Sequence, residues 1–335
     1  MKLTKETLKR IIKEEIENVL REEGEESLTP EEREGLIELL KDEDRDNIRQ
    51  GIFMAEDFMS SEEILEIVFK QNGWKQGGIN WFLLEELPDS GFWNRIESLD
   101  LSDQRFTSLP ESFGNLTNLT WLELSGNQLK NLPESFGNLT NLKALFLEGN
   151  QLESLPDSIG NLKNLSSLFV RVSQLESLPE SIGNLKNLTE LDLSGNRLNN
   201  LPNTIGNLKN LTELDLSYNY LKSLPESFGN LKNLTGLKII DNNLTSLPDS
   251  IGNLANLTEF NLAVNRLYNL PNTIGNLKNL TSLNLAQNYL SSLPEGIKNL
   301  TQLKTLMIAR NPMTQSREFD SYELMQILPN TKIHS

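Results

Sequence analysis

One 23-residue period of the chain, residues 178–200, reads LPESIGNLKNLTELDLSGNRLNN. The Leu-Pro pair that opens it returns every 23 residues, at Leu109, Leu132, Leu155, Leu178, Leu201, Leu224, Leu247, Leu270 and Leu293. Self-similarity at a fixed period of this length is typical of proteins built from stacked structural repeats. The period therefore predicts a solenoid, in which each repeat contacts its neighbours.

Each period also contains the pattern L-x-x-L-x-L-x-x-N-x-L, which occurs in ten registers. In one of them Leu122 and Leu124 alternate with other residues, and this period of two predicts a short β-strand. A single repeat cannot bury these leucines, so we expect neighbouring strands to form one parallel sheet. The Leu-Pro pair predicts an extended return path, and the glycine of SIGNLKNL predicts a tight turn on the outer arc.

An asparagine ends the strand in eight of the ten registers, and its amide is suited to bond the backbone groups left open at the bend. Gln104 and Ser173 stand at this position in the first and fourth registers, where we expect looser hydrogen bonding. The asparagines form a predicted structural ladder of Asn127, Asn150, Asn196, Asn219, Asn242, Asn265, Asn288 and Asn311.

The form LPxSIGNLxNLTxLxLSxN resembles the leucine-rich repeats of intracellular bacterial and Ras-group proteins, from about residue 92 to the C-terminus. The resemblance implies an α/β solenoid: a right-handed leucine-rich-repeat horseshoe with a concave parallel β-sheet. The match is specific for the fold and weak for function, because the family is defined by its repeated framework.

We expect three segments. Residues 1–90 show no 23-residue period and hold 24 acidic and 12 basic residues, so they are predicted to form an acidic, small all-α domain. Within it, residues 1–23 are either a separate helix that docks a partner or an ordinary helix packed on its own domain. Thr29-Pro30 predicts the start of a further helix, because threonine is a good N-cap and proline is favoured at the first helical position. Residues 91–315 are the predicted solenoid of about ten repeats, and residues 316–335 are a predicted helical cap.

The composition of the 335-residue chain excludes several classes of function. The formal net charge of −16 disfavours binding to nucleic acid, whose phosphates need a basic face. Cysteine is absent and histidine occurs once, at His334, which leaves little material for nucleophilic catalysis or a zinc site. With no long apolar run, the sequence favours a cytoplasmic protein with no membrane contact, no cofactor and no catalytic residue.

The variable residues of the strands are predicted to lie on the concave face and to select a partner protein. Trp121, Phe146 and Phe169, with Arg171 beside them, are expected to form an exposed aromatic patch of the kind found at binding hot spots. The alternative is cross-strand stacking that only stabilises the sheet.

A second predicted cluster is acidic. Glu190, Asp192, Glu213 and Asp215 fall on neighbouring strands, where like charges repel. They favour either a partner with a basic surface or a plain solvated acidic face; a calcium site is disfavoured because an open sheet offers no cage. The complete set of expected partner-binding residues is Trp121, Glu123, Phe146, Phe169, Arg171, Glu190, Asp192, Glu213, Asp215, Lys238 and Glu259.

The function that these features predict is non-enzymatic protein–protein interaction through the concave face. The alternative is a substrate-recognition or regulatory subunit of an enzyme system whose catalytic part is another chain. A hydrolase that uses paired carboxylates is disfavoured, because an open sheet gives general acid–base groups no desolvated pocket. The sequence leaves the oligomeric state and the identity of the partner open.

Overall fold

The computed structural model describes residues 30–40, 96–315 and 321–335. The chain divides into two units, Met1–Ile96 and Glu97–Ser335, which are described separately. In the first unit the described element is helix α2 (Pro30–Leu40), which begins at the proline that the sequence indicated, with Leu36 buried. The predicted helix over residues 1–23 and the remainder of the predicted helical domain lie outside the described residues.

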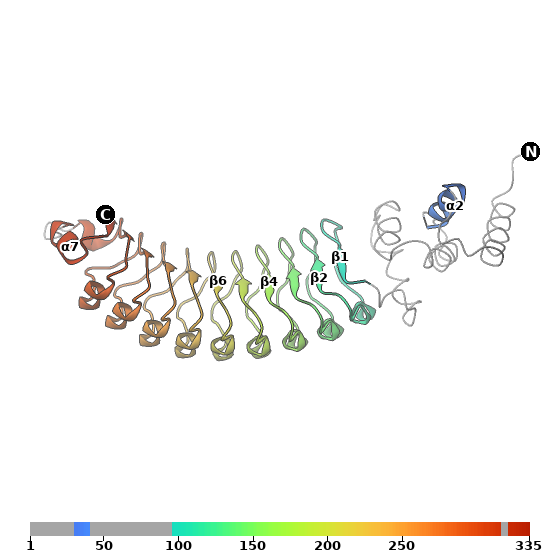
Figure 1. Cartoon of the computed structure of the whole chain (residues 1–335), viewed down its shortest axis with the longest axis horizontal. Coiled ribbons are helices and arrows are strands. Elements are labelled where there is room, and N and C mark those ends of the chain that lie inside the picture. The colour runs from blue at the N-terminus through green and yellow to red at the C-terminus, as the bar shows by residue number, and fades with distance from the viewer. Residues whose placement is uncertain (1–29, 41–95, 316–320) are drawn as a thin grey trace, which may run out of the picture. The chain divides into compact units, whose positions relative to one another are not determined.

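The second unit is a solenoid in which each coil contributes one strand and one short 3₁₀ helix (Figure 1). The strands are β1 (Ser98–Asp100), β2 (Trp121–Glu123), β3 (Ala144–Phe146), β4 (Ser167–Phe169), β5 (Glu190–Asp192), β6 (Glu213–Asp215), β7 (Gly236–Lys238), β8 (Glu259–Asn261), β9 (Ser282–Asn284), β10 (Thr305–Met307) and β11 (Lys332–His334). The helices are η2 (Glu111–Asn115), η3 (Glu134–Asn138), η4 (Asp157–Asn161), η5 (Glu180–Asn184), η6 (Asn203–Asn207), η7 (Glu226–Asn230), η8 (Asp249–Asn253), η9 (Asn272–Asn276) and η10 (Glu295–Asn299).

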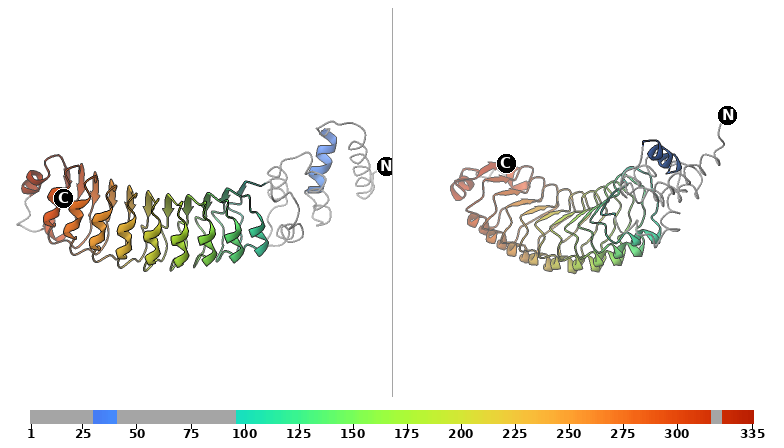
Figure 2. Two further views of the ribbon diagram at one scale, coloured as in Figure 1. Left: turned by 60° about the horizontal axis from the view of Figure 1, so that its bottom comes forward. Right: turned by 45° about the vertical axis from the view of Figure 1, so that its right-hand side comes forward.

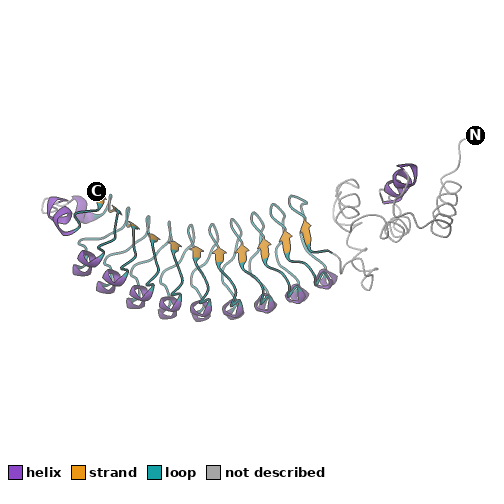
Figure 3. Cartoon of the chain, in the orientation of Figure 1, coloured by secondary structure: helices purple, strands orange, loops and turns teal. Residues whose placement is uncertain are grey.

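All eleven strands form one sheet in chain order, and every neighbouring pair is parallel. The register is constant, since Leu191 on β5 pairs with Leu214 on β6 at the same position of the next repeat. The strands line the inner side of the arc and the 3₁₀ helices its outer side (Figures 2 and 3). The predicted parallel sheet on a concave face is therefore present.

The pattern leucines fill the space between these two layers. Leu122 and Leu124 are fully buried, and so are their counterparts in the other central repeats. After the strand, the Leu-Pro pair carries the chain outward in an extended conformation, as at Pro179 with φ −67° and ψ 150°. Each coil thus buries its leucines against the coils on either side, which is why the stack rather than the single repeat is stable.

The glycine of the outer arc has a different role from the tight turn that we expected. Gly160 lies inside η4, and a Cβ atom added there would be 2.5 Å from the carbonyl oxygen of Ser181 in the next helix. Gly137 stands in the same relation to Ser158, at 2.6 Å. This position needs glycine because successive 3₁₀ helices approach so closely that no side chain fits between them.

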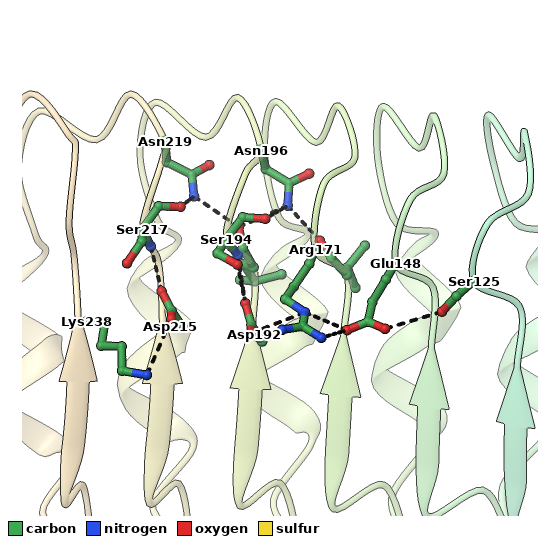
Figure 4. Close-up of polar contacts among 12 residues, drawn as sticks. Ser125, Glu148, Arg171, Asp192, Ser194, Asn196, Asp215, Ser217, Asn219 and Lys238 are labelled. Atoms are coloured by element: carbon green, nitrogen blue, oxygen red, sulfur yellow. Dashed lines mark hydrogen bonds and ion pairs between the residues drawn. The ribbon is translucent and has the colours of Figure 1, made fainter.

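The ladder asparagines are buried and bridge successive coils. Asn196 Nδ2 donates to the carbonyls of Leu193 (2.9 Å) and Val170 (2.7 Å), and its Oδ1 accepts from Leu175 N at 3.0 Å. Figure 4 shows Asn196 and Asn219 in the loops that follow their strands. These bonds satisfy backbone groups that the leucine core would otherwise leave without a partner.

The two departures from asparagine behave differently from the ladder. Gln104 Nε2 donates to Ser102 O at 2.6 Å within its own coil. Ser173 is too short to reach the neighbouring coil, and its buried Oγ makes no hydrogen bond to any described residue. Hydrogen bonding is looser at the fourth register for this reason.

The C-terminal end differs in part from the predicted helical cap. Two short helices, α6 (Pro312–Gln315) and α7 (Ser321–Ile327), follow the last coil, with Leu324 and Leu328 buried but Ile327 42% exposed. The chain then adds β11 beside β10 as an eleventh strand. This strand was not predicted from the sequence, because its three residues, Lys332–His334, lack the leucine pattern of the repeats.

Candidate functional site

The candidate site is the solvent face of the sheet, where the residues between the buried leucines point away from the core. Trp121, Phe146 and Phe169 stand on the adjacent strands β2, β3 and β4, and each is partly exposed. The ring centroids of Trp121 and Phe146 are 5.6 Å apart, and those of Phe146 and Phe169 are 5.1 Å apart with nearly parallel planes. Phe146 and Phe169 are stacked and Trp121 is tilted by 50° against Phe146; we call these three neighbouring rings the aromatic stack.

Arg171 does not join this stack. Its guanidinium binds Glu148 through Nε and Nη2 and lies 3.6 Å from Asp192 Oδ2, so it bridges the coils on either side (Figure 4). The hydrogen bond to Glu148 raises the pKa of Arg171 above its ordinary value. Glu148 Oε2 also accepts from Ser125 Oγ at 3.4 Å, which extends this charged row toward β2.

The four clustered carboxylates pair directly across two strands. Glu190 lies opposite Glu213, and Asp192 lies opposite Asp215. Each aspartate accepts a hydrogen bond at 2.9 Å from the backbone N–H of the serine two residues later, and Asp215 lies 4.0 Å from Lys238 Nζ. The repulsion that we expected within this cluster is therefore relieved in part by groups of the same chain.

The carboxylates differ in their surroundings. Burial raises the pKa of Asp192 above its ordinary value, although hydrogen bonds from Ser194 and the charge of Arg171 act in the opposite direction. The carboxylate of Glu213 occupies the space that a side chain at Gly236 would fill. Its Oε1 accepts a hydrogen bond from Thr235 Oγ1 at 2.8 Å. The resulting surface offers fixed, oriented negative charge next to the aromatic stack.

The remaining predicted residues lie on the same face. Glu123 on β2 accepts from Ser125 N at 2.8 Å, Lys238 on β7 is exposed, and Glu259 on β8 is exposed. Within the described ranges, no group of three metal-ligating side chains comes together, so the carboxylates do not form a cation cage. All of these residues stand on the solvent side of one continuous parallel sheet.

Sequence reasoning missed a group of aromatic residues beside this face. Tyr218, Tyr220, Tyr268 and Tyr289 are each at least half exposed, and the rings of Tyr268 and Tyr289 stack at 5.6 Å. They lie in the loops that follow the strands, within three residues of a ladder asparagine. The signal in the sequence is the recurrence of tyrosine at loop positions near the ladder asparagines, which a comparison of strand positions alone does not include.

The fold and this face define a class: a repeat protein whose variable strand residues stand on the solvent side of an open parallel sheet. Models of a leucine-rich repeat region match residues 94–192 and 180–266, and a leucine-rich repeat model matches residues 279–300. The chain belongs to the leucine-rich-repeat family. A search of curated proteins gave no match.

Solved structures share the fold. A leucine-rich-repeat protein of Leptospira interrogans is 27% identical with a TM-score of 0.52, over 78% of this chain and 86% of that one. The functional domain of InlJ from Listeria monocytogenes is 24% identical with a TM-score of 0.60, over 72% of this chain and 49% of that one. The plant peptide hormone receptor RGFR1, solved in complex with RGF2, is 28% identical with a TM-score of 0.51, over 71% of this chain and 44% of that one.

The chain thus spans less than half the length of the last two relatives, and most of the length of the first. None of the helices in the described part of the chain has the length and apolar character needed to cross a bilayer.

Proposed function

We propose that the chain is a non-enzymatic interaction module that binds a partner protein on the concave face. Proteins with this fold are commonly protein–protein interaction modules, and similar structures include receptors. The observation that carries the proposal is the aromatic stack of Trp121, Phe146 and Phe169, which is partly exposed on the solvent side of a sheet whose own core is complete without it. Large aromatic side chains dominate the energy of protein interfaces.

The charge beside the stack supports a partner with a basic surface. Glu190 and Glu213 are exposed, and Asp192 and Asp215 retain partial exposure despite their contacts. A basic partner would complete the neutralisation that Arg171 and Lys238 begin, and the acidic face would steer it during association. A cytoplasmic setting, the absence of catalysis and the three-segment organisation stay predictions from the sequence.

The test of the aromatic stack compares two stacked aromatic pairs on one chain. The full chain and two double variants, Phe146→Ala/Phe169→Ala and Tyr268→Ala/Tyr289→Ala, are used to capture proteins from extract of the source cell, with quantification by mass spectrometry. We expect a partner whose recovery falls at least about tenfold with the first variant and is retained with the second. Equal recovery of every protein by wild type and by the Phe146/Phe169 variant refutes the proposal, provided that both variants unfold at temperatures close to the wild type.

The charge of the partner is tested with the turn geometry held constant. Asn261 and Asn284 occupy the position of Asp192 and Asp215 in later coils, and their Oδ1 atoms accept the same backbone hydrogen bond, at 3.1 and 3.0 Å. The double variant Asp192→Asn/Asp215→Asn therefore removes charge without breaking the turn, and it should weaken binding of a basic partner and reduce its salt dependence.

The matched control removes two acids from the outer arc, through Asp157→Asn/Asp249→Asn in the first turns of η4 and η8. Equal weakening by both variants would show that only net charge matters. A partner that binds the Asp192/Asp215 variant as tightly as the wild type contradicts the basic-surface assignment.

A further inference from the structure

The exposed tyrosines gather at one edge of the solenoid. The chain has five tyrosines, and four of them lie in the loops after β6, β8 and β9: Tyr218, Tyr220 and Tyr289 adjoin a ladder asparagine, and Tyr268 lies three residues after Asn265. Their exposed fractions are 59% for Tyr218, 52% for Tyr220, 59% for Tyr268 and 50% for Tyr289. Phe113, Phe136 and Phe228, in the 3₁₀ helices of the outer arc, are fully buried, so these four tyrosines differ from the core aromatic residues of the described coils.

The same loops carry positive charge on an acidic protein. From one residue before to three residues after each ladder asparagine, in the coils from β5 to β10, the charged residues are Arg197, Lys222, Arg266 and Arg310 against the single carboxylate of Asp241. The four cations are exposed and form no ion pair within the described ranges, unlike Arg171 and Lys238 on the concave face. The whole chain carries a formal net charge of −16, so the sign of the charge at this edge is opposite to that of the chain as a whole.

The backbone under this surface is fixed. Tyr220 N donates to Leu198 O at 2.9 Å, and Tyr289 N donates to Leu267 O at 3.0 Å. The intervening coils repeat this bond, which forms a second hydrogen-bonded ladder that runs from coil to coil along the loops. Side chains on such a ladder are held at a regular spacing before any partner arrives, and this lowers the entropy lost on binding.

Tyr218 stands in a turn that recurs along the solenoid. Its φ of 58° is in the left-handed region, and the residue at the same position has positive φ in each of the ten described coils, whether it is a glycine, as at Gly195, or a larger residue, as at Val264. The left-handed conformation is therefore a property of the repeat, and it fixes the direction in which the Tyr218 side chain leaves the backbone. The ring at 218 is more than half exposed, so packing within the fold does not account for its presence.

We propose that Tyr218, Tyr220, Tyr268 and Tyr289, with Arg197 and Arg266, form a second binding surface, the tyrosine edge, which binds an acidic segment of a partner protein. Arginine binds carboxylates through paired hydrogen bonds, and tyrosine supplies a flat ring and a hydroxyl donor at little cost in conformational entropy. The charge of the edge is opposite to that of the concave face, so the two surfaces select different partners. A nucleic acid fits less well, because its dense phosphate charge meets a chain of net charge −16.

The experiment isolates ligands of the edge before their charge is examined. A random peptide library is selected on the full wild-type chain and depleted on the Tyr268→Ala/Tyr289→Ala variant, whose charge is unchanged. We expect the remaining peptides to be rich in aspartate and glutamate, and a synthetic copy of one to bind the wild type with an affinity that falls as salt rises. Remaining peptides that are basic or uncharged, or a library that depletion empties, overturn the proposal.

The synthetic peptide is then measured against matched charge reversals by fluorescence anisotropy. Arg197→Glu/Arg266→Glu should weaken binding at least about tenfold, whereas Lys209→Glu/Lys232→Glu, the same reversal at exposed lysines of the outer arc, should change it less than about twofold. Equal loss in the two variants means that only net charge acts, and it overturns the proposal.

Two further samples separate this surface from its alternatives. The variant Phe146→Ala/Phe169→Ala should bind the acidic peptide normally, so a failure of the concave-face function and a failure of the tyrosine edge are distinguishable. A fluorescent single-stranded oligonucleotide of mixed sequence should not bind at physiological salt. Binding of that oligonucleotide that is lost in the Arg197/Arg266 variant would instead make the edge a nucleic-acid surface and overturn the assignment.

Discussion

An exchange of serine and asparagine between two neighbouring coils tests how the ladder holds the coils together. Asn196 Nδ2 donates to Val170 O and its Oδ1 accepts from Leu175 N, at 2.7 and 3.0 Å. Ser173 occupies the same position one coil earlier and makes no such bond. We predict that Ser173→Asn stabilises the protein and that Asn196→Ser destabilises it.

The magnitudes follow from the groups affected. Asn196→Ser leaves Val170 O and Leu175 N without partners, while Leu193 O keeps a bond from Asn219 at 3.0 Å. A buried backbone group without a partner costs about 1–3 kcal/mol, so two such groups predict a loss of about 2–6 kcal/mol in the free energy of unfolding.

Ser173→Asn supplies an acceptor for the buried N–H of Leu152, which has no hydrogen bond among the described residues. It also gives second bonds to Leu147 O and Val170 O, which already accept from Asn150 and Asn196. New buried hydrogen bonds contribute about 0.5–1.5 kcal/mol each, and ordering the longer side chain costs about 1 kcal/mol. Three such bonds less the cost of ordering predict a gain of about 0.5–3.5 kcal/mol in the free energy of unfolding.

Urea unfolding of the full chain, followed by far-UV circular dichroism, measures both changes. Because stacked coils contribute stability locally, native-state hydrogen exchange gives an independent readout. The Leu175 amide should exchange faster in Asn196→Ser, and the Leu152 amide should exchange more slowly in Ser173→Asn. If Ser173→Asn leaves both the urea midpoint and the Leu152 exchange rate unchanged, the reasoning that these amides hold the coils together is wrong.

Three further predictions concern single positions. Val172→Gly should raise the free energy of unfolding by about 1 kcal/mol, because an exposed β-branched residue at φ 51° is strained. Gly149→Val, at the same position of the previous coil, should lower the free energy of unfolding. Urea midpoints that move in the same direction in the two variants contradict this reasoning. Asp192 has a raised folded-state pKa, so its contribution to stability is present below its ordinary pKa, near about pH 4, and is lost as the pH rises through the folded value. Asp192→Asn should remove that pH dependence, and melting temperatures that differ from the wild type by a constant amount across the acid range would exclude it. Gly160→Ala should cost about 1–3 kcal/mol, because the added Cβ would lie 2.5 Å from the Ser181 carbonyl; a midpoint equal to the wild type shows that the outer arc has room.

The two proposed surfaces of the solenoid differ in how the sequence reveals them. Phe146 and Phe169 stand out in the sequence because most residues at the equivalent position of the other strands are polar. The alternation of buried and exposed residues along a strand predicts that this position faces solvent. Tyr220 and Tyr289 follow the ladder asparagines in loops, where no periodicity says which way a side chain points. Their exposure and common edge emerged only when the coils were stacked.

Charge pairing likewise required the structure. Arg171 appeared in the sequence as a companion of the aromatic residues, but its guanidinium binds Glu148, which is 23 residues away along the chain and one coil away in space. Asp192 and Asp215 appeared as a repulsive pair, yet each also accepts a hydrogen bond from a nearby serine. The sequence shows which position of the repeat each residue occupies, but it does not show the rotamer that decides which neighbouring side chain the residue contacts.

The sequence alone determined the stacked parallel strands, the buried leucines and the asparagine positions. The reason is physical: a leucine pattern repeated in ten registers has one way to bury its apolar side chains, which is to align each coil with the next. Tertiary structure decided what depends on distances between coils: that Gly160 is needed for close approach, that Lys332–His334 join the sheet as β11, and that tyrosines and arginines share an edge. These features arise from contacts between residues that periodicity does not relate, so they appear only when the coils are placed side by side.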